Sequence, residues 1–260
     1  MITISVVTIT FNAAKHLKST LDSVLMQSYP HVEHLIVDGA STDDTLSIAS
    51  AYEEVSNNAE NEHVIRIQSE PDKGLYDAMN KGLALASGDY VVFLNAGDAF
   101  PATDTLEQVA LIAEGGDGED HPAVVYGDTD IIDEMGNFVR HRRLQPPETL
   151  SWHSFKEGML VCHQAFYARL DIARRVTYDL RYRFSADVDW CIRIMKVAEE
   201  EGLPLRNVHS VIANYLNEGQ TTKNHRTSLK ERFDVMCHHY GVWTTIVQHL
   251  WFVVRHFRTA

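Results

Sequence analysis

Carboxylate and amide side chains directly follow three strongly apolar segments of the chain. Phe11-Asn12 follows the segment 2–10, Asp38 follows 32–37, and Asn95-Ala96-Gly97-Asp98 follows Val91-Val92-Phe93-Leu94. Side chains of this kind can hold a divalent cation through oxygen, or accept hydrogen bonds from a nucleotide base or ribose. Asx-Gly sequences are equally typical of turns, so a purely structural role stays open at these positions.

Two further segments carry residue types suited to chemistry. The segment 72–82 places Gly74 before a predicted helix and Gly82 inside it, where glycine costs about 1 kcal/mol relative to alanine. Close packing of the helix on a sheet, or space for a ligand, would explain Gly82. Asp187 and Asp189 lie at a predicted helix start, where the helix dipole favours acids, but a carboxylate there can also take a proton from an attacking hydroxyl.

The elements that must position these residues alternate between strand and helix. The sequence predicts strands at 2–10, 32–38, 63–69 and 90–94 and helices at 17–25, 76–86 and 103–113. Ser41 and Asp44 resemble a capping box, which predicts a further helix that ends near residue 55. This order predicts a doubly wound α/β sheet. Ligands of such sheets gather beyond the carboxyl ends of the strands, where the polar residues lie, so we expect one site there.

The pattern loosens after residue 120. We expect strands at 123–126 and 138–142, paired as a hairpin around 135–137, and a further strand at 160–167. A helix is expected at 188–200, with Ser185 as its cap and Gly202 at its end. Helices are expected at 229–239 and 242–256. The simplest organisation is one domain over 1–220, with a nucleotide-binding half at 1–120 and an acceptor half at 121–220, followed by a helical C-terminal extension at 221–260.

Composition excludes several classes of protein. The 260 residues carry a formal charge of −13, which argues against a nucleic-acid partner. Neither a GxGxxG turn nor a phosphate-binding P-loop sequence follows the first strand, so NAD enzymes and P-loop NTPases fit poorly. The three cysteines form no CxxC pair, and the chain carries no leader or bilayer-spanning apolar run, so we expect a cytoplasmic protein.

Four segments in order resemble the family 2 glycosyltransferases, which are inverting enzymes with the GT-A fold. They are 5–12, 35–45, 72–82 and 88–98, and His163-Gln164 and Asp187 extend the resemblance more weakly. The resemblance implies a mixed, mainly parallel α/β sheet of the Rossmann-like GT-A type, flanked by helices. The family's frequent Asp-Asp-Gly-Ser is Asp38-Gly39-Ala40-Ser41 here, its metal-binding DxD segment becomes Asn95-Ala96-Gly97-Asp98, and Ala186 replaces the acid before Asp187.

The resemblance also implies a role for each matching residue. Asp187 would be the catalytic base, and Asp98 would bind Mg²⁺ or Mn²⁺. The nucleotide site would comprise Thr8, Phe11, Asn12, Asp38, Asp72, Gly74 and Asn95. The acceptor would lie near His163, Gln164 and Trp190.

The implied reaction transfers a sugar from a nucleoside-diphosphate donor, most readily a UDP-sugar, to a hydroxyl of a glycan or lipid-linked glycan during cell-surface polysaccharide synthesis. Two alternatives stay open: a nucleotidyltransferase that makes sugar nucleotides, and a sugar-nucleotide-binding protein without activity. The first would be expected to carry a glycine-rich phosphate loop after the first strand, and none is visible.

The last forty residues reverse the charge balance of the chain. From 220 to 260 there are six Lys or Arg residues against two acids, and apolar residues including Trp243 and Trp251 recur at helical spacing. An amphipathic helix of this kind can dock on an anionic membrane. It can equally pack on its own domain or on a second subunit in a homodimer, so membrane docking and protein packing both stay open.

Overall fold

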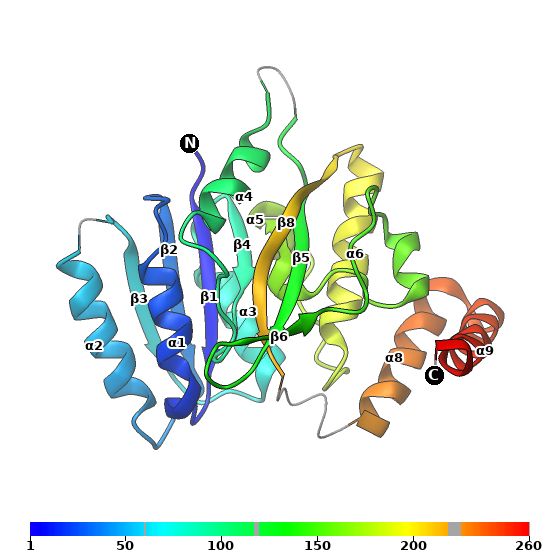
Figure 1. Ribbon diagram of the computed structural model, residues 1–260, viewed down its shortest axis with the longest axis horizontal. Helices are drawn as coiled ribbons and strands as arrows, with labels where there is room; N and C mark the ends of the chain where they lie inside the picture. The colour runs from blue at the N-terminus through cyan, green and yellow to red at the C-terminus, as the bar shows by residue number, and fades with distance from the viewer. Residues whose placement is uncertain (60, 117–119, 218–224, 260) are drawn as a thin grey trace.

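The computed structural model describes residues 1–59, 61–116, 120–217 and 225–259, and within these ranges the side chains except those of 225, 226 and 252–259. The described strands form one mixed sheet of eight, in the order β3-β2-β1-β4-β7-β5-β6, with β8 paired to β5. Figure 1 shows this sheet at the centre of the molecule, with the C-terminal helices at one end.

The first half of the sheet is parallel, as the alternating pattern predicted. β1 (Ile4–Thr10), β2 (Val32–Asp38), β3 (Val64–Ser69) and β4 (Tyr90–Phe93) alternate with α1 (Ala14–Leu25), α2 (Thr45–Asn57) and α3 (Leu75–Leu85). β1, β2 and β4 are buried along their whole length, which suits their β-branched and aromatic side chains. α4 (Thr105–Glu114) follows, so the predicted doubly wound fold is confirmed.

The second half of the sheet is mostly antiparallel. β5 (Val124–Ile132) and β6 (Phe138–His141) form the expected hairpin, and β7 (Phe166–Arg169) joins β4 to β5. The strand predicted at 160–167 is wrong in its first part, because the 3₁₀ helix η2 (His163–Ala165) precedes β7. β8 (Leu205–Leu216), which runs parallel to β5, was not predicted.

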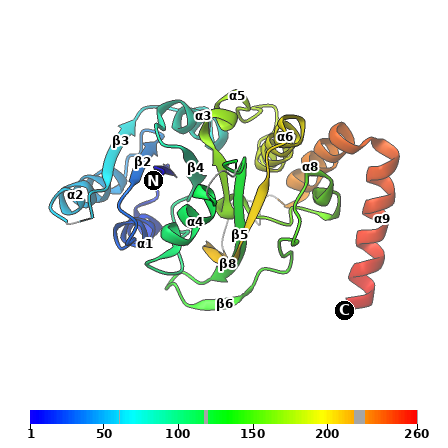
Figure 2. The same cartoon turned by 90° about the horizontal axis from the view of Figure 1, so that it is seen from above.

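Helices cover both faces of the sheet. In Figure 2, α3, α5 (Leu170–Arg175) and α6 (Ala186–Glu201) lie on one face, and α1, α2 and α4 lie on the other. Gly82 of α3 explains this close packing, since an added Cβ would lie 2.5 Å from the Val7 side chain of β1. Gly82 is thus a packing residue, and the alternative of ligand space is wrong.

Two predicted helix caps take other partners. The Ser41 hydroxyl donates to Asp38 instead of capping α2, which begins at Thr45. The Ser185 hydroxyl donates to the carbonyl of Ser228 and makes no cap hydrogen bond. Ser41 also accepts a hydrogen bond from the amide of Asn12, 29 residues earlier, and the Ser185 bond spans 43 residues. A sequence pattern within one element does not detect such long-range bonds.

The C-terminal helices α8 (His225–Tyr240) and α9 (Val242–Thr259) pack beyond α6 (Figures 1 and 2). α8 is joined to α6 by a buried hydrogen bond, with His239 Nε2 2.8 Å from Asp189 Oδ1. The domain boundary predicted at 220/221 lies outside the described residues. No helix in the described part of the chain is long and apolar enough to cross a membrane.

Candidate functional site

The polar residues singled out from the sequence meet at one edge of the sheet. Thr10 pairs with Asp38 at the ends of β1 and β2, and β4 runs parallel to β1 on the other side. Asn12, Asp38 and Asn95 therefore follow adjacent strands at the same edge, the lower one in Figure 1. The predicted position of the site in the fold agrees with this arrangement.

Asp38 closes the ends of three strands rather than facing open space. It is almost fully buried, and its carboxylate accepts hydrogen bonds from Thr10, from Ser69 and from both the amide and the hydroxyl of Ser41. Burial alone would raise the pKa of Asp38, but these hydrogen bonds outweigh it and hold the pKa below its ordinary value. Direct contact between Asp38 and a nucleotide does not fit this structure.

Gly39 leaves room for a carboxylate that comes from another element. A Cβ added to Gly39 would lie 2.3 Å from Asp72 Oδ2 and 3.3 Å from the ring of Phe11. Asp72 Oδ1 accepts a hydrogen bond of 2.7 Å from the amide of Gly74. Phe11 is 64% exposed, so its ring and the Asp72 carboxylate border a surface that a ligand can reach.

Asn12 and Thr8 take different places at the end of β1. Asn12 is exposed, with φ of 49°, and its side-chain oxygen accepts a hydrogen bond from the Thr42 amide at 2.9 Å. Thr8 is fully buried, and its hydroxyl lies 2.9 Å from His34 Nε2. The prediction that Thr8 lines a nucleotide site is corrected, because the side chain has no exposed surface.

Asp98 is buried beneath the loop that follows β4. It is 3% exposed, with Gln164 Nε2 donating to Oδ2 at 2.8 Å and the Leu216 amide donating to Oδ1 at 3.1 Å. Burial raises the pKa of Asp98 to about 6 despite these hydrogen bonds. Leu216 ends β8, so the strand that was not predicted fixes this carboxylate.

A divalent cation does not fit these residues as they are arranged. Both Asp98 oxygens already accept hydrogen bonds, and position 95 offers an amide in place of a carboxylate. Within the described ranges, no group of three or more His, Cys, Asp and Glu side chains is placed to hold a metal ion. The prediction that Asp98 is a metal ligand is therefore not supported by this geometry.

Asp187 lies at the first turn of α6 and is held from two sides. The Tyr76 hydroxyl of α3 donates to Oδ1 at 3.0 Å, and His163 Nδ1 lies 3.4 Å from Oδ2. Burial would raise the pKa of Asp187, but His163, the charge of Arg232 and Tyr76 outweigh it and keep the pKa below its ordinary value. Asp187 is therefore a carboxylate at neutral pH, in the form that can accept a proton.

The three residues predicted to lie near the acceptor have separate positions. His163 faces Asp187 and Asn95, whereas Gln164 is 1% exposed and bonded to Asp98. Trp190 is fully buried and stacks on Tyr178 with ring centroids 4.8 Å apart. Acceptor contacts by Gln164 and Trp190 are corrected, because neither side chain is open to a ligand in this structure.

Sequence reasoning missed the residues that hold the start of α6. Glu231 of α8 accepts hydrogen bonds from the backbone amides of Arg183 (3.1 Å) and Phe184 (2.7 Å). Tyr76 lies within the quoted segment 72–82, but nothing in its spacing indicates a contact with Asp187, 111 residues away. These partners come from separate elements, and only the folded structure brings them together.

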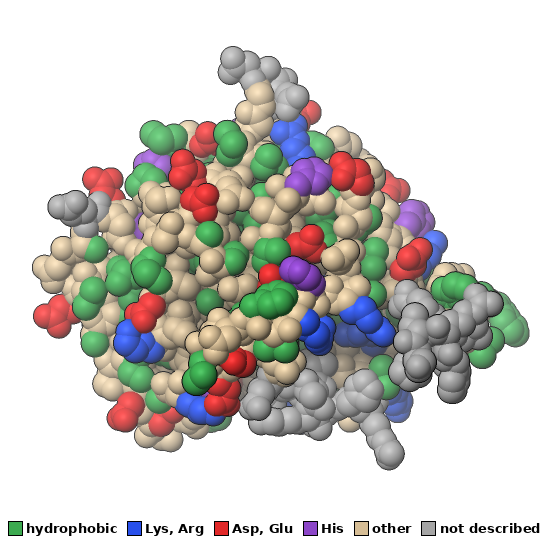
Figure 3. Space-filling model, viewed as in Figure 1, with side chains coloured by type: hydrophobic (Ala, Val, Ile, Leu, Met, Phe, Trp, Pro, Cys, Tyr) green, Lys and Arg blue, Asp and Glu red, His purple; other side chains and the backbone are tan. Residues whose placement is uncertain are grey.

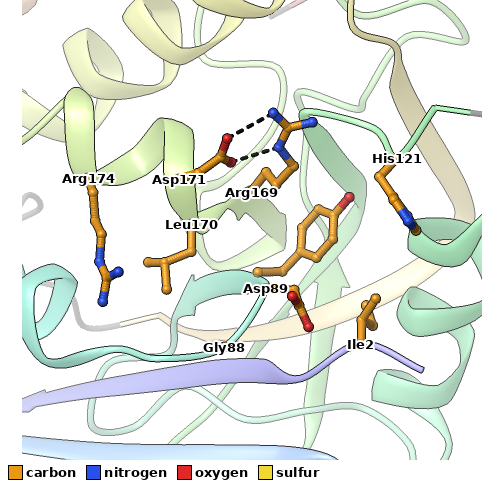
Figure 4. A pocket seen from close by; sticks show the side chains of 9 residues that line it. Ile2, Gly88, Asp89, His121, Arg169, Leu170, Asp171 and Arg174 are labelled. Atoms are coloured by element: carbon orange, nitrogen blue, oxygen red, sulfur yellow. Dashed lines mark hydrogen bonds and ion pairs between the residues drawn. The ribbon is translucent and has the colours of Figure 1, made fainter.

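A cavity of about 390 Å³ lies at the opposite edge of the sheet, next to the first residues of β1 and β4. Its lining includes Ile2, Gly88 and Arg169, and Figure 4 shows Arg169 paired there with Asp171. Because the carboxyl ends of the parallel strands lie at the other edge, this cavity is separate from the candidate site.

Comparison with known proteins identifies the family and agrees with the fold. The family model described as "Glycosyl transferase family 2" matches residues 5–176. A "PGL/p-HBAD biosynthesis glycosyltransferase" of Mycobacterium bovis is 37% identical over 213 residues, which are 81% of this chain and 75% of that protein. The "Putative teichuronic acid biosynthesis glycosyltransferase TuaG" of Bacillus subtilis is 38% identical over 111 residues, 43% of this chain and 42% of that one.

Solved structures share the fold at low sequence identity. TarS of S. aureus (residues 1–349, in complex with UDP-GlcNAc) superposes with a TM-score of 0.68 at 17% identity, covering 90% of this chain and 64% of that one. The mannosyltransferase PcManGT from Pyrobaculum calidifontis, in complex with GDP-Man and Mn²⁺, gives 0.62 at 17% identity, covering 96% and 73%. With its GT-A-like sheet, its family match and its relatives, the chain belongs to glycosyl transferase family 2 and is a glycosyltransferase.

Proposed function

We propose that Asp187 is the general base of a single-displacement, inverting sugar transfer. The observation that supports this most directly is its position: an ionised carboxylate at the start of α6, bonded by Tyr76 and His163. The acceptor hydroxyl gives its proton to Asp187 and attacks the anomeric carbon, and the nucleoside diphosphate leaves from the opposite side. No covalent enzyme intermediate is required.

The Tyr76 hydroxyl serves as a fixed donor to this base. Burial and the neighbouring Asp187 raise the pKa of Tyr76 well above its ordinary value, so the phenol keeps its proton throughout the neutral range. A donor on Oδ1 and a second group on Oδ2 fix the orientation of the carboxylate. Asp189 cannot replace Asp187, because it is buried and paired with Arg193 and His239.

The donor proposed is a UDP-sugar whose uridine lies against Phe11 and between the loops of Asn12 and Asp72. An exposed ring offers a stacking surface, and a carboxylate can accept the N–H of a uracil base. Gly74 borders the same surface and leaves it open, since an added Cβ there would meet nothing within 4 Å. The solved TarS complex with UDP-GlcNAc supports the choice of nucleotide by analogy.

The proposed acceptor is a glycan or a lipid-linked glycan of the cell surface. Two relatives are named for the biosynthesis of PGL/p-HBAD and of teichuronic acid. The exposed apolar residues of α9 also suit an enzyme whose acceptor is carried by a lipid. Trp243, Val247, Leu250 and Trp251, here called the α9 apolar face, are each at least 50% exposed.

We propose that the α9 apolar face docks on an anionic membrane at the cytoplasmic side. α9 contacts α8, where Phe233 meets His249, yet this packing leaves the face uncovered (Figure 3). Tryptophans on such a face favour a membrane interface, and the sequence adds Arg255 and Arg258 at the helix end. Flotation with anionic liposomes that is lost in Trp243→Glu/Leu250→Glu would support docking; a dimer lost in the same variant would assign the face to a second copy.

A panel of UDP-, GDP- and TDP-sugars, assayed for release of the nucleoside diphosphate, tests the activity. A transferase releases UDP from one sugar nucleotide, and Asp187→Asn should lower turnover by about 10²-fold or more while UDP still binds. Release of pyrophosphate from a nucleoside triphosphate and a sugar phosphate would indicate a nucleotidyltransferase instead. UDP-sugar binding without turnover would indicate a silent binding protein.

The choice between Mg²⁺ and Mn²⁺ is tested by titrating UDP in EDTA and in each ion. Metal dependence is typical of the family. Because Asp98 is buried and bonded here, we expect UDP to bind without metal and either ion to improve its affinity by no more than about tenfold. If UDP binding strictly required one of the two ions, and Asp98→Asn abolished the effect of that ion, Asp98 would be its ligand after all.

A further inference from the structure

The amide at position 95 contacts a histidine that in turn contacts the proposed base. Asn95 Nδ2 lies 3.1 Å from His163 Nε2, and His163 Nδ1 lies 3.4 Å from Asp187 Oδ2. Three elements meet here: the loop after β4, the 3₁₀ helix η2 and the start of α6. All three side chains are largely buried, so the contacts are protected from competing water.

The chemistry of an amide limits which nitrogen of His163 carries the proton. A side-chain NH₂ group only donates, so Nε2 must be the acceptor when Asn95 Nδ2 faces it. A neutral imidazole whose Nε2 accepts carries its hydrogen on Nδ1. That hydrogen is then on the nitrogen that lies 3.4 Å from Asp187 Oδ2.

If the amide turns over, His163 keeps its donor to Asp187 in the imidazolium form only. Asn95 Oδ1 is buried without a partner, and a flipped amide would present this oxygen to His163. It would then accept from Nε2–H, and the imidazolium form of His163, which has hydrogen on both nitrogens, still donates from Nδ1 to the Asp187 carboxylate. A neutral ring with its hydrogen on Nε2 would instead turn the Nδ1 lone pair toward the carboxylate, which is repulsive.

We propose that Asn95 keeps Nδ1 of His163 protonated, so that His163 donates to Asp187 and positions the base of the transfer. This gives a role to the Asn95 amide, which occupies a position where the family's metal-binding segment has a carboxylate. A carboxylate at position 95 could only accept, from Nε2–H, so His163 would then keep its donor to Asp187 only as the imidazolium, with a hydrogen on both nitrogens. The proposal rests on the proposed role of Asp187 as the base.

Two isosteric variants of His163 separate this role from simple packing. The Nδ2 of an asparagine lies as many bonds from the backbone as Nδ1 of histidine, whereas the Nε2 of a glutamine corresponds to Nε2. His163→Asn should therefore keep kcat within about threefold, and His163→Gln should lower kcat by roughly 10- to 100-fold with the Kd for UDP unchanged. His209→Asn, at an exposed position of β8, is the matched control.

The tautomer itself is read from ¹⁵N NMR of the full chain with labelled histidine, with His163→Asn used to assign the resonance. Nδ1 of His163 should be protonated in the wild type, and Asn95→Asp should place a proton on Nε2 of His163. An Nε2-protonated neutral ring in the wild type, or equal kcat for the Asn and Gln variants, would overturn the proposal. If no sugar nucleotide is turned over, the proposed function fails, while the NMR spectrum still decides the tautomer.

Discussion

Asp38 is the residue whose predicted role changes most in the folded chain. Its carboxylate accepts four hydrogen bonds at the ends of β1, β2 and β3, so it organises the ligand-binding edge without facing a ligand. In Asp38→Asn, an NH₂ group would face two of these donors, whichever way the amide is turned, and could accept from neither. We expect a loss of about 2–3 kcal/mol in the free energy of unfolding, measured by urea denaturation at pH 7.

The pH dependence of this loss follows from the lowered pKa of Asp38. A carboxyl whose folded pKa lies below its unfolded value adds stability above the unfolded pKa, and this stability is lost as the pH falls through the folded pKa. The difference between wild type and Asp38→Asn should therefore shrink in acid. Asp44→Asn, at an exposed acid, is the control; an equal loss there would contradict a specific role for Asp38.

The close approach of the Asp72 carboxylate to Gly39 can be tested by substitution. In Gly39→Ala the new methyl would occupy the position of the Asp72 carboxylate, which must move away from the Phe11 ring. We expect the Kd for UDP, measured by calorimetry, to rise roughly tenfold, while the melting temperature changes little. In an Asp72→Ala background the same methyl meets no carboxylate, so the two changes should not add. Additive losses would mean that Gly39 acts through another group.

Only some of the predicted site residues lie where the sequence indicated, and the wrong predictions have the same physical cause. Residue types placed Asp38, Asn95 and Asp98 at one edge, but Thr8, Gln164 and Trp190 were expected on a surface and are buried. Neighbouring residues on a strand or helix can point either into the core or toward a ligand. Which of the two a side chain does depends on the residues that pack against it, and these residues belong to other elements.

At the scale of elements, β2 contains a buried histidine that makes the fold sensitive to acid. His34 lies between the hydroxyls of Thr8 and Tyr52, and burial, with His63 nearby, lowers its pKa to about 3. The unfolded chain takes up this proton near its ordinary pKa, whereas the folded chain does not. Stability should thus fall by about 1.4 kcal/mol for each pH unit between roughly 6.5 and 3.

Chemical denaturation at several pH values measures this slope. His34→Gln should be less stable at pH 7, since Gln cannot reproduce both hydrogen bonds, but its slope should be shallower by about the amount contributed by one histidine. The slope of His209→Gln, at an exposed position, should match the wild type. An unchanged slope in His34→Gln would show that other groups control the acid sensitivity.

Elements with regular patterns were predicted, and those shaped by distant contacts were not. The first four strands and the hairpin of β5 and β6 follow from apolar runs and turn residues. β8 lacks the regular alternation of apolar and polar residues that indicates a strand. Its register against β5 shifts, and His209 within it has φ of 59°, so its side chains do not alternate regularly between the two faces of the sheet. The 3₁₀ helix η2 was read as strand, since His163 and Gln164 turn inward to Asn95 and Asp98.

At the scale of the whole molecule, α8 connects the C-terminal segment to the proposed base. Glu231 accepts the amides of Arg183 and Phe184 just before α6, three residues or more from Asp187. Glu231→Ala would leave these amides without their partner and loosen the start of α6. We expect kcat to fall roughly tenfold with the Kd for UDP unchanged. Asp234→Ala, an exposed acid on the same helix, should leave both values unchanged.

Truncations separate the roles of the two C-terminal helices. α8 is part of the folded core: Val235 and Met236 are buried, and His239 pairs with the buried Asp189. A chain ending at 220 would lose these buried residues and would leave Asp189 with Arg193 as its partner. We expect this chain to be unfolded or insoluble, as judged by circular dichroism and size-exclusion chromatography.

A chain ending at 241 keeps α8 and loses the α9 apolar face. It should fold, bind UDP with unchanged affinity and turn over a water-soluble acceptor, because the contacts of α6 are intact. It should no longer float with anionic liposomes. Deletion of α9 that abolishes UDP binding in a folded chain would contradict this division, as would a chain of 1–220 with native circular dichroism and full turnover.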